Sequence, residues 1–239
     1  MPDFSKRSYQ KELLDRNDIP FAHIKQNMLE LDVINTYLGG HNITIHGLQT
    51  LLHQTVVHRQ PITICEIGCG GGDNLRVIRN CCSKKNIPVH LIGIDINPHC
   101  IEYAKSRKEN NEIEFITSDY LQVRFDETPH IIFSSLFCHH FTNDELQIQL
   151  NWMKMHTQTG FFINDLHRHP LAYYSISSIT KLFSKSYLVK NDAPLSVLRG
   201  FTKRELTAIT KQLSMVNYQL KWRWAFRWLL IYTHDRETL

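Results

Sequence analysis

Residues 62–73 combine an apolar run, a glycine cluster and two carboxylates, a set that suits the binding of a small charged ligand. Four glycines lie between positions 68 and 72, with Glu66 just before them and Asp73 directly after. Glycine permits positive φ angles and lets the backbone approach a ligand closely. The preceding β-branched run has the composition of a strand, and apolar residues recur at helical spacing after the glycines. The pattern predicts a strand, a tight ligand-binding turn and a helix.

The two acids favour one kind of nucleotide-like ligand at this turn. The dinucleotide-binding pattern G-x-G-x-x-G would place its third glycine at position 73, where this chain has Asp73. The carboxylates of Glu66 and Asp73 also repel phosphate, which a helix N-terminus otherwise attracts. S-adenosylmethionine carries a sulfonium, an ammonium and a ribose but no phosphate. The acidic turn therefore favours this cofactor over NAD.

Later apolar runs also end in polar residues. Asp95 closes the run at 89–95, and its carboxylate can accept hydrogen bonds from both ribose hydroxyls. The run at 130–135 leads into His139 and His140, ahead of a helix-capping box at 142–145. In open α/β sheets, ligands bind at the carboxyl ends of the strands. These side chains are therefore expected at the same sheet edge as the glycine turn.

The segment Glu66-Ile-Gly68-Cys-Gly70-Gly-Gly72, followed by Asp95 and Asp119, resembles the first motif and following anchors of class I S-adenosylmethionine-dependent methyltransferases. The resemblance covers roughly residues 60–165. It implies an α/β fold with a Rossmann-like, doubly wound seven-stranded sheet, mostly parallel with an antiparallel C-terminal strand. It also implies S-adenosyl-L-methionine as cofactor and S-adenosyl-L-homocysteine as product. The cofactor-binding residues that it implies are Glu66, Gly68, Cys69, Gly70, Asp95, Ile96, Asp119, Tyr120, Ser135 and Leu136.

The chain is expected to divide into an N-terminal helical cap at 1–58 and a methyltransferase domain at 59–239. Helices are predicted over 8–15, 21–38 and 46–58, the middle one with an apolar stripe at spacings of three and four. Residues 166–201 are long for a plain crossover and are expected to form an acceptor-side insertion or lid. Two C-terminal strands are predicted at 218–224 and 227–234, with Trp222 and Trp224 in the sheet core.

Shorter phrases, including Asn164–Tyr173 and Asp192–Phe201, resemble small stand-alone methyltransferases of polyketide, phenolic-lipid and pigment pathways. This resemblance implies O-methylation of a small hydroxylated aromatic or polyketide-derived acceptor in secondary metabolism. A neutral imidazole can remove a phenol proton, so His140 is the first candidate base and His167 the second. The expected acceptor contacts are His139, Tyr173 and Arg199.

Three alternatives remain open at this point. Methyl transfer to carbon or nitrogen of a quinone-like molecule would use the same cofactor but would not support the assignment of a histidine base. An NAD(P)-dependent oxidoreductase would share the fold. An inactive cofactor-binding partner subunit would share every cofactor residue.

Composition supports a small globular protein. The 239 residues are 42% hydrophobic and carry a formal charge of +4 without a dense Lys/Arg tract, so no nucleic-acid partner is expected. No signal peptide or apolar run of about 18 residues is present, which predicts a cytoplasmic protein without a membrane partner. The six cysteines form no C-x-x-C pair, so reduced thiols and no metal are expected. A monomer or homodimer is expected.

Overall fold

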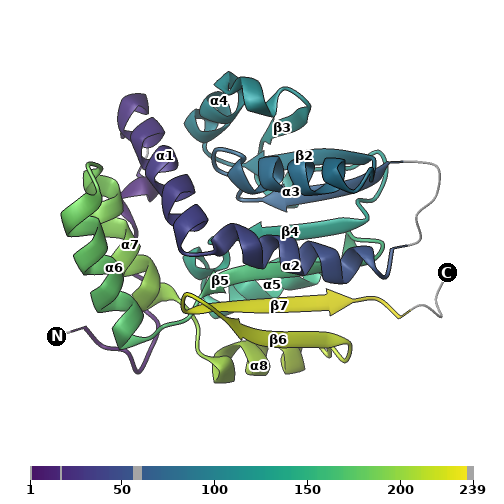
Figure 1. Cartoon of the computed structure of the whole chain (residues 1–239). Coiled ribbons are helices and arrows are strands. Elements are labelled where there is room, and N and C mark those ends of the chain that lie inside the picture. The colour runs from purple at the N-terminus through teal and green to yellow at the C-terminus, as the bar shows by residue number, and fades with distance from the viewer. Residues whose placement is uncertain (1, 17, 56–60, 236–239) are drawn as a thin grey trace.

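The computed structural model describes residues 2–16, 18–55 and 61–235. Its centre is one seven-stranded sheet in the order β3-β2-β1-β4-β5-β7-β6 (Figure 1). The strands are β1 (Ile62–Ile67), β2 (Val89–Asp95), β3 (Ile113–Thr117), β4 (Ile131–Ser135), β5 (Gly160–Leu166), β6 (Tyr218–Arg223) and β7 (Arg227–Thr233). The first five are parallel, and β7 pairs antiparallel with both β5 and β6. The predicted doubly wound sheet with an antiparallel C-terminal pair is confirmed.

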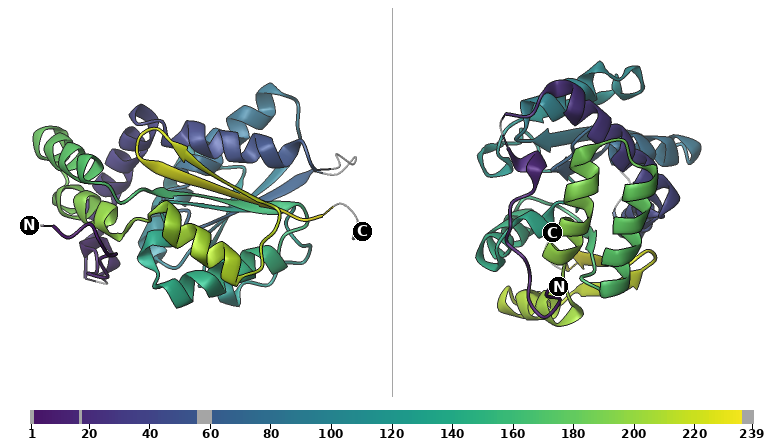
Figure 2. Two further views of the ribbon diagram at one scale, coloured as in Figure 1. Left: turned by 90° about the horizontal axis from the view of Figure 1, so that it is seen from below. Right: turned by 90° about the vertical axis from the view of Figure 1, so that its left-hand side faces the viewer.

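Helices cover both faces of this sheet, as the view from below shows (Figure 2). The eight α-helices are α1 (Phe21–Tyr37), α2 (Gly40–Leu52), α3 (Asp73–Lys84), α4 (Pro98–Ser106), α5 (Asn143–Met155), α6 (Pro170–Phe183), α7 (Tyr187–Arg199) and α8 (Lys203–Gln212). Apolar side chains of α2, α3 and α4 share one buried cluster with one sheet face. Those of α5 and α8 share a second cluster with the opposite face. Burial of both faces explains why the central strands are almost continuously apolar.

Helix α2 lies directly on the sheet because glycine occupies its contact position. Gly47 is buried, and a Cβ atom there would lie 2.6 Å from Cδ2 of Phe162 on β5. The Phe162 ring in turn stacks on Phe133 of β4, with ring centroids 4.9 Å apart. The third predicted helix, expected over 46–58, corresponds to α2, which begins at Gly40 and ends at Leu52, and it is part of the layer that covers the sheet. Its expected last residues, 56–58, and the expected boundary at 58 and 59 lie outside the described residues.

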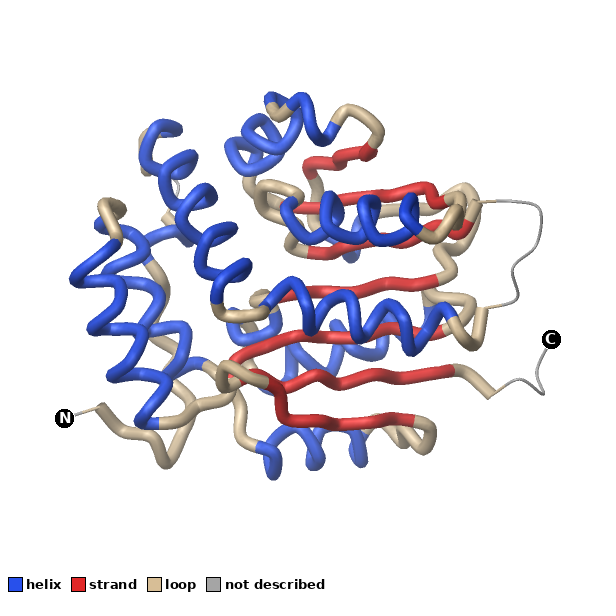
Figure 3. The backbone as a smooth tube through the Cα atoms, viewed as in Figure 1, coloured by secondary structure: helices blue, strands red, loops and turns tan. Residues whose placement is uncertain are grey.

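Helices α1, α6 and α7 lie beyond the carboxyl ends of the parallel strands (Figures 1 and 3). Helix α1 contacts α2, α4 and α7. Helices α6 and α7 pack side by side in opposite directions and are joined by a short connection (Figure 2). The long stretch predicted as an acceptor-side insertion thus consists chiefly of these two helices. Together, α1, α6 and α7 enclose the edge of the sheet where ligands bind in such folds.

The prediction of a helix over residues 8–15 is wrong. Only Leu13–Asp15 forms a single 3-10 turn, η1, and the chain before it runs across α7. Its backbone amides bond outside the segment: Ser8 donates to the Leu198 carbonyl at 3.0 Å, and Leu13 donates to the Asp192 carboxylate at 2.8 Å. Bonds to another element satisfy these donors, so a local helix is not needed.

The prediction that Trp222 and Trp224 belong to the sheet core is also wrong. Trp222 is 44% exposed, and Trp224, in the turn after β6, is 67% exposed. Strand β6 is the edge strand, so no further strand covers it on one side. By contrast, Trp228 on the interior strand β7 is buried, and its indole donates to the Phe201 carbonyl. Alternation alone does not distinguish an edge strand from an interior one.

All six cysteines are free thiols, and five of them are buried.

Within the residues that the structure describes, every helix is too short or too polar to span a bilayer.

We predict that Gly47→Ala destabilises the fold. The new methyl group overlaps the Phe162 ring, and such overpacking costs typically about 1–3 kcal/mol. Higher helix propensity of alanine returns up to about 1 kcal/mol. Urea denaturation followed by circular dichroism should show a lower midpoint. Asn42→Ala, at an exposed position of the same helix, is the control and should not lower it. Equal midpoints for the two variants would contradict the close contact.

Candidate functional site

A cavity of about 1010 Å³ lies at the carboxyl ends of the parallel strands, between the sheet edge and α1, α6 and α7. Its polar side is formed by the glycine turn and by residues that follow β2, β3 and β4. Its apolar side is formed by helix residues, among them Met28, Leu31, Ile34, Ile176 and Val197. The predicted apolar stripe of α1 therefore faces this space as well as the protein interior. One cavity is thus lined both by polar groups of the sheet edge and by apolar side chains of the helices.

The glycine turn has the conformation that its composition predicts. Gly68, Gly70 and Gly72 have φ angles of 68°, 51° and 73°. A Cβ atom on Gly68 would lie only 2.3 Å from the Phe137 ring, so the loop after β4 packs directly on the turn. The Gly68 and Cys69 amides both donate to the Ile94 carbonyl, at 2.8 and 3.0 Å. These bonds fix the backbone of the turn beside the cavity.

Glu66 lies at the end of β1, 1% exposed, in the cavity wall. Its Oε1 accepts a hydrogen bond from Nδ2 of Asn74 at 3.0 Å, whereas Oε2 has no partner among the described residues. Burial, reinforced by the neighbouring Asp73, raises the pKa of Glu66 well above its usual range. A buried carboxyl with an unpaired oxygen suits a cationic ligand, because such a ligand supplies the missing partner and favours the ionised form.

Asn74 also links the turn to the helices that cover it. Its Oδ1 lies 3.1 Å from Nδ1 of His41 and 3.2 Å from Oγ1 of Thr44, both on α2. His41 Nε2 then contacts the carboxylate of Asp32 on α1 at 3.2 Å. Burial opposes the charged imidazole, but the Asp32 carboxylate raises the pKa of His41 above its usual value. The end of β1 is therefore tied to α1 and α2 through one amide side chain.

Asp95, at the end of β2, faces the cavity from the other side of the turn. It accepts hydrogen bonds from the backbone amides of Gly70 and Asn97, each at 2.9 Å. Burial raises the pKa of this carboxyl above its ordinary value. Ile96, next in the chain, also lines the cavity and is exposed. This arrangement suits a ribose, whose hydroxyls can donate to a fixed carboxylate.

Asp119 and Tyr120 line the cavity after β3, as expected for residues beside a nucleobase. Asp119 caps the short turn η3 (Tyr120–Gln122) by accepting a hydrogen bond from the Leu121 amide at 3.0 Å. The buried Tyr120 ring contacts Phe137, Phe141 and Trp152 edge-on. The cavity therefore has an acidic group and an aromatic cluster at its β3 end.

Ser135 and Leu136 line the middle of the cavity, after β4. Leu136 has a φ of 54°, which turns the chain sharply, and its amide donates to the Asn164 carbonyl at 2.9 Å. The turn η4 (Cys138–His140) follows directly. The residues predicted for the cofactor thus all lie at one edge of the sheet, spread from β3 to β4.

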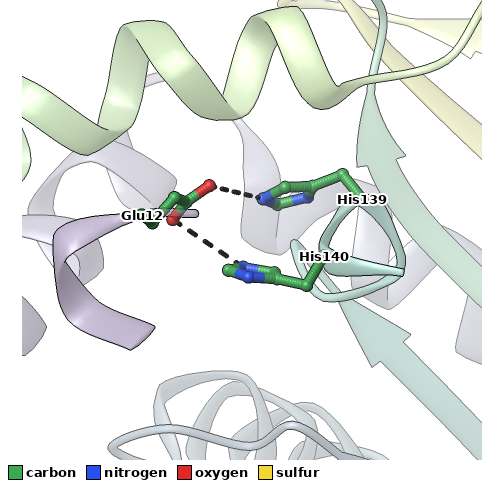
Figure 4. Close-up of side chains that lie close together, drawn as sticks. All are labelled: Glu12, His139 and His140. Carbon is green, nitrogen blue, oxygen red and sulfur yellow. Dashed lines mark ion pairs between the residues drawn. The ribbon is translucent and has the colours of Figure 1, made fainter. Parts of the chain in front are cut away.

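His139 is buried between the carboxylates of Asp165 and Glu12, and Figure 4 shows it beside Glu12. Its Nδ1 lies 2.7 Å from Oδ1 of Asp165, and its Nε2 lies 3.5 Å from Oε1 of Glu12. Burial disfavours the charged ring, yet Asp165 and Glu12 together raise the pKa of His139 to about 9. An imidazolium that pairs with carboxylates through both nitrogens has no free lone pair, so His139 is not suited to act as a base.

His140 follows in the same turn but is less enclosed, with 23% of its side chain exposed. Its Nδ1 lies 3.3 Å from Oδ1 of Asp15, and its Nε2 lies 3.8 Å from Oε2 of Glu12 (Figure 4). Its backbone carbonyl accepts a hydrogen bond from Arg199 at 2.8 Å. The two adjacent histidines therefore have different surroundings, and only His140 has both a fixed carboxylate neighbour and partial access to the cavity.

Sequence reasoning missed Glu12 and Asp15, which come from a segment far from the histidines in the chain. Glu12 is buried, accepts a hydrogen bond from Ser196 at 2.6 Å and lines the cavity with Asp15. Glu12, His139 and His140 are spaced closely enough to hold a metal ion. The Arg199 guanidinium, however, lies 4.0 Å from the same Glu12 oxygen that faces His139, and this charge opposes a further cation.

Three predicted site residues do not line the cavity. His167 lies outside it, where its Nδ1 accepts a hydrogen bond from the Trp222 indole at 3.2 Å, and burial lowers its pKa. The Tyr173 ring packs edge-on against Phe4. Arg199 is buried, and its guanidinium donates to backbone carbonyls of the histidine turn, including that of His139 at 3.2 Å. Arg199 therefore holds the turn in place.

Sequence reasoning also missed Arg227 and Trp224, which belong to the cavity wall from the β6–β7 hairpin. The sequence predicts both as strand residues. Long-range packing decides whether such a residue reaches a cavity at the ends of other strands, so the local sequence does not reveal it. Arg227 is buried, and its Nη2 donates to Oδ1 of Asn35 on α1 at 2.9 Å.

Comparisons with known proteins agree with this geometry. The family model described as "Methyltransferase domain" matches residues 64–160. No curated protein sequence matches the chain at a significant level. Among solved structures, the plantazolicin methyltransferase BpumL in complex with SAH is 15% identical, with 90% of this chain and 95% of that chain covered and a TM-score of 0.65.

Two further structures are similar in fold. Human N-acetylserotonin methyltransferase in complex with SAM is 14% identical over 90% of this chain and 57% of that chain, with a TM-score of 0.62. Magnesium protoporphyrin IX methyltransferase from Synechocystis PCC 6803 with bound SAM is 11% identical over 84% and 82%, with a TM-score of 0.55. The family model over residues 64–160 shows that this chain contains a methyltransferase domain, and its sheet order agrees with the fold of these structures.

Proposed function

We propose that this methyltransferase transfers the methyl group to a hydroxyl of a small aromatic or polyketide-derived acceptor. The observation that carries the proposal is the cavity itself, whose wall combines carboxyl groups of the sheet edge, apolar side chains of the covering helices, and His140. The apolar residues of α1, α6 and α7 suit a planar, weakly polar molecule. The three structural relatives are named for chemically different acceptors. The proposal that oxygen receives the methyl group therefore rests on the site and not on these relatives.

In the proposed complex the cofactor is S-adenosylmethionine, and it extends along the sheet edge from β3 to β1. Asp119 and Tyr120 hold the adenine end, Asp95 and Ile96 hold the ribose, and Glu66 faces the cationic end. Cys69, Ser135 and Leu136 form the wall between these groups. The cofactor supplies an electrophilic methyl group on its sulfonium. The chain's own residues align the acceptor and exclude water, which is most of what an in-line displacement requires.

His140 is the proposed base. Asp15 faces its Nδ1 at 3.3 Å and orients the ring, and the hydroxyl of the acceptor would replace the longer 3.8 Å contact of Nε2 with Glu12. The ring centroids of His139 and His140 lie 4.5 Å apart. Because His139 is fixed by Asp165, the turn that carries His140 is fixed as well.

The cap, residues 1–58, and the insertion, residues 166–201, are proposed to form the acceptor side of the protein, the cap through the residues before α2, since α2 itself covers the sheet. Segment 7–15 lies across α7, and Arg7 ties it to the histidine turn by donating to the carbonyls of His139 and Phe141 at 3.1 and 2.8 Å. Helices α1, α6 and α7 supply the apolar side of the cavity. Residues 59–239 then supply the cofactor site, with the α6–α7 pair inserted after β5.

Purified protein incubated with labelled S-adenosylmethionine and a panel of phenols, quinones and aromatic amines tests the proposed reaction. Label on a phenolic oxygen is the expected result. Label on carbon or nitrogen would agree with the proposed cofactor site but would contradict the proposed role of His140 as a base. Cofactor binding without transfer to any acceptor would indicate an inactive partner subunit, and calorimetric binding of NAD(H) in place of S-adenosylmethionine would indicate an oxidoreductase.

We predict that His140→Ala lowers kcat by roughly 10²–10⁴-fold, the usual contribution of a general base, while the Kd for S-adenosylmethionine stays nearly unchanged. Steady-state kinetics and calorimetry provide the two values. His90→Ala, a partly exposed histidine near the start of β2, is the matched control and should behave as the parent does. Because His167 lies outside the cavity, His167→Ala should have little effect on kcat. Undiminished turnover in His140→Ala would remove this residue from the reaction.

We predict that cofactor binding releases protons, in part from Glu66. Burial raises the pKa of this carboxyl in the free protein, and a cationic ligand lowers it again. Affinity should therefore rise with pH until the raised pKa is passed. Calorimetry in buffers of different ionisation enthalpy measures the number of protons released. Glu66→Gln should bind more weakly and release fewer protons, whereas Glu114→Gln, half exposed on β3, should match the parent protein. Unchanged release in Glu66→Gln would overturn this assignment.

A further inference from the structure

One cation in the cavity wall differs from the others. The basic side chains that line the cavity are Arg16, His99, His139, His140 and Arg227. The first four each lie within 4.0 Å of a carboxylate: Asp18, Glu102, Asp165 and Asp15 respectively. Among the described residues, Arg227 has no carboxylate within ion-pair distance, and its only bond to a side chain is the one to the neutral amide of Asn35.

Arg227 is also the most enclosed arginine that faces the cavity. It is 3% exposed, and its Nη1 has no hydrogen-bond partner in the part of the chain that the structure describes. Burial lowers its pKa to about 10, so the guanidinium remains charged at neutral pH. Asp165 and Asp73 favour this charge from beyond ion-pair distance, but a buried N–H group without a hydrogen-bond partner still costs free energy that a bound anion would recover. Nη1 therefore has the properties of a binding group for an anion.

The hydrogen bonds of Arg227 place it beside the glycine turn. Asn35, which accepts from its Nη2 at 2.9 Å, in turn donates to Oδ2 of Asp73 at 3.4 Å. Asp73 is the first residue of α3, directly after the glycines. Asp95 bonds the Gly70 amide within the same turn and lies toward β3. Arg227 thus approaches from the β7 side, opposite the ribose-binding side.

The backbone of the turn offers few donors to an anion. The amides of Gly68 and Cys69 donate to Ile94, that of Gly70 donates to Asp95, and that of Gly72 donates to Cys69. The carboxyl groups of Glu66 and Asp73 also lie nearby, and their oxygens are acceptors rather than donors to an anion. A carboxylate bound at this end of the cavity therefore requires a side-chain cation.

S-adenosylmethionine and S-adenosylhomocysteine both carry a free α-carboxylate at the end remote from adenine. We propose that Arg227 binds this carboxylate through Nη1, with Asn35 holding the guanidinium by its other nitrogen. The β6–β7 hairpin would then contribute to the cofactor site as well as to the sheet. The inference concerns the cofactor and does not depend on which acceptor receives the methyl group.

Binding of two ligands to the purified chain tests the proposal. S-adenosylhomocysteine contains the carboxylate, whereas 5′-methylthioadenosine lacks the whole amino-acid end. Arg227→Met should weaken the binding of S-adenosylhomocysteine by roughly 10- to 150-fold, the value of a charge-assisted hydrogen bond, and should leave 5′-methylthioadenosine nearly unaffected. Equal losses for both ligands would show a structural role only, and no loss for either would show that Arg227 does not contact the cofactor.

Arg76→Met is the matched control. Arg76 pairs with Asp32 at 2.6 Å in the same polar network but does not line the cavity, so the ratio of the two affinities should stay as in the parent protein. If Arg227→Met does not fold, the parent protein still decides the question. Its affinity for the methyl ester of S-adenosylhomocysteine, in which the carboxyl group is neutral, should then be lower than for the acid by a similar factor, and equal affinity for acid and ester would overturn the proposal.

Discussion

The side chain of Asn74 is the contact on which the arrangement of this site depends. Its amide nitrogen holds Glu66 at the end of β1, and its amide oxygen faces His41 and Thr44 of α2. His41 extends the connection to Asp32 of α1. The glycine turn, the layer that covers the sheet and the helix that encloses the cavity are therefore positioned by one buried network. Such a network is stable only when its members are satisfied together, which fixes α1 relative to the sheet.

The part of the site that the sequence predicts is the part that depends on local order. Glu66 and Asp95 each end a strand, and parallel strands bring their carboxyl ends to one edge whatever the detailed packing. Glu12 and Arg227 could not be found in this way. Glu12 lies in an extended segment held by bonds to α7, and Arg227 reaches the cavity from an antiparallel strand. Long-range contacts decide both positions, and neither leaves a periodic signal in the chain.

The same distinction explains the wrong predictions. Residues 8–15 contain apolar and charged residues at spacings compatible with a helix, but Asp192 satisfies the amides of Leu13 and Leu14. Trp222 and Trp224 alternate as in a buried strand, yet they lie on and after the edge strand. The adjacent residues His139 and His140 show that neighbouring positions in the chain can place the same side chain in different surroundings. One ring lies between two carboxylates and is held charged, while the other remains partly open to the cavity.

The carboxylates around the cavity have a consequence for the exchange of cofactor and product. Glu66, Asp95 and Asp119 line the cavity in which the sulfonium is proposed to bind. Methyl transfer converts the sulfonium to a neutral thioether, so the bound molecule loses one positive charge without losing any of its other groups. Coulomb attraction to an acidic wall weakens at that moment. The wall thus distinguishes the reactive cofactor from its spent form by charge alone, which favours release of the product and its replacement by a fresh molecule.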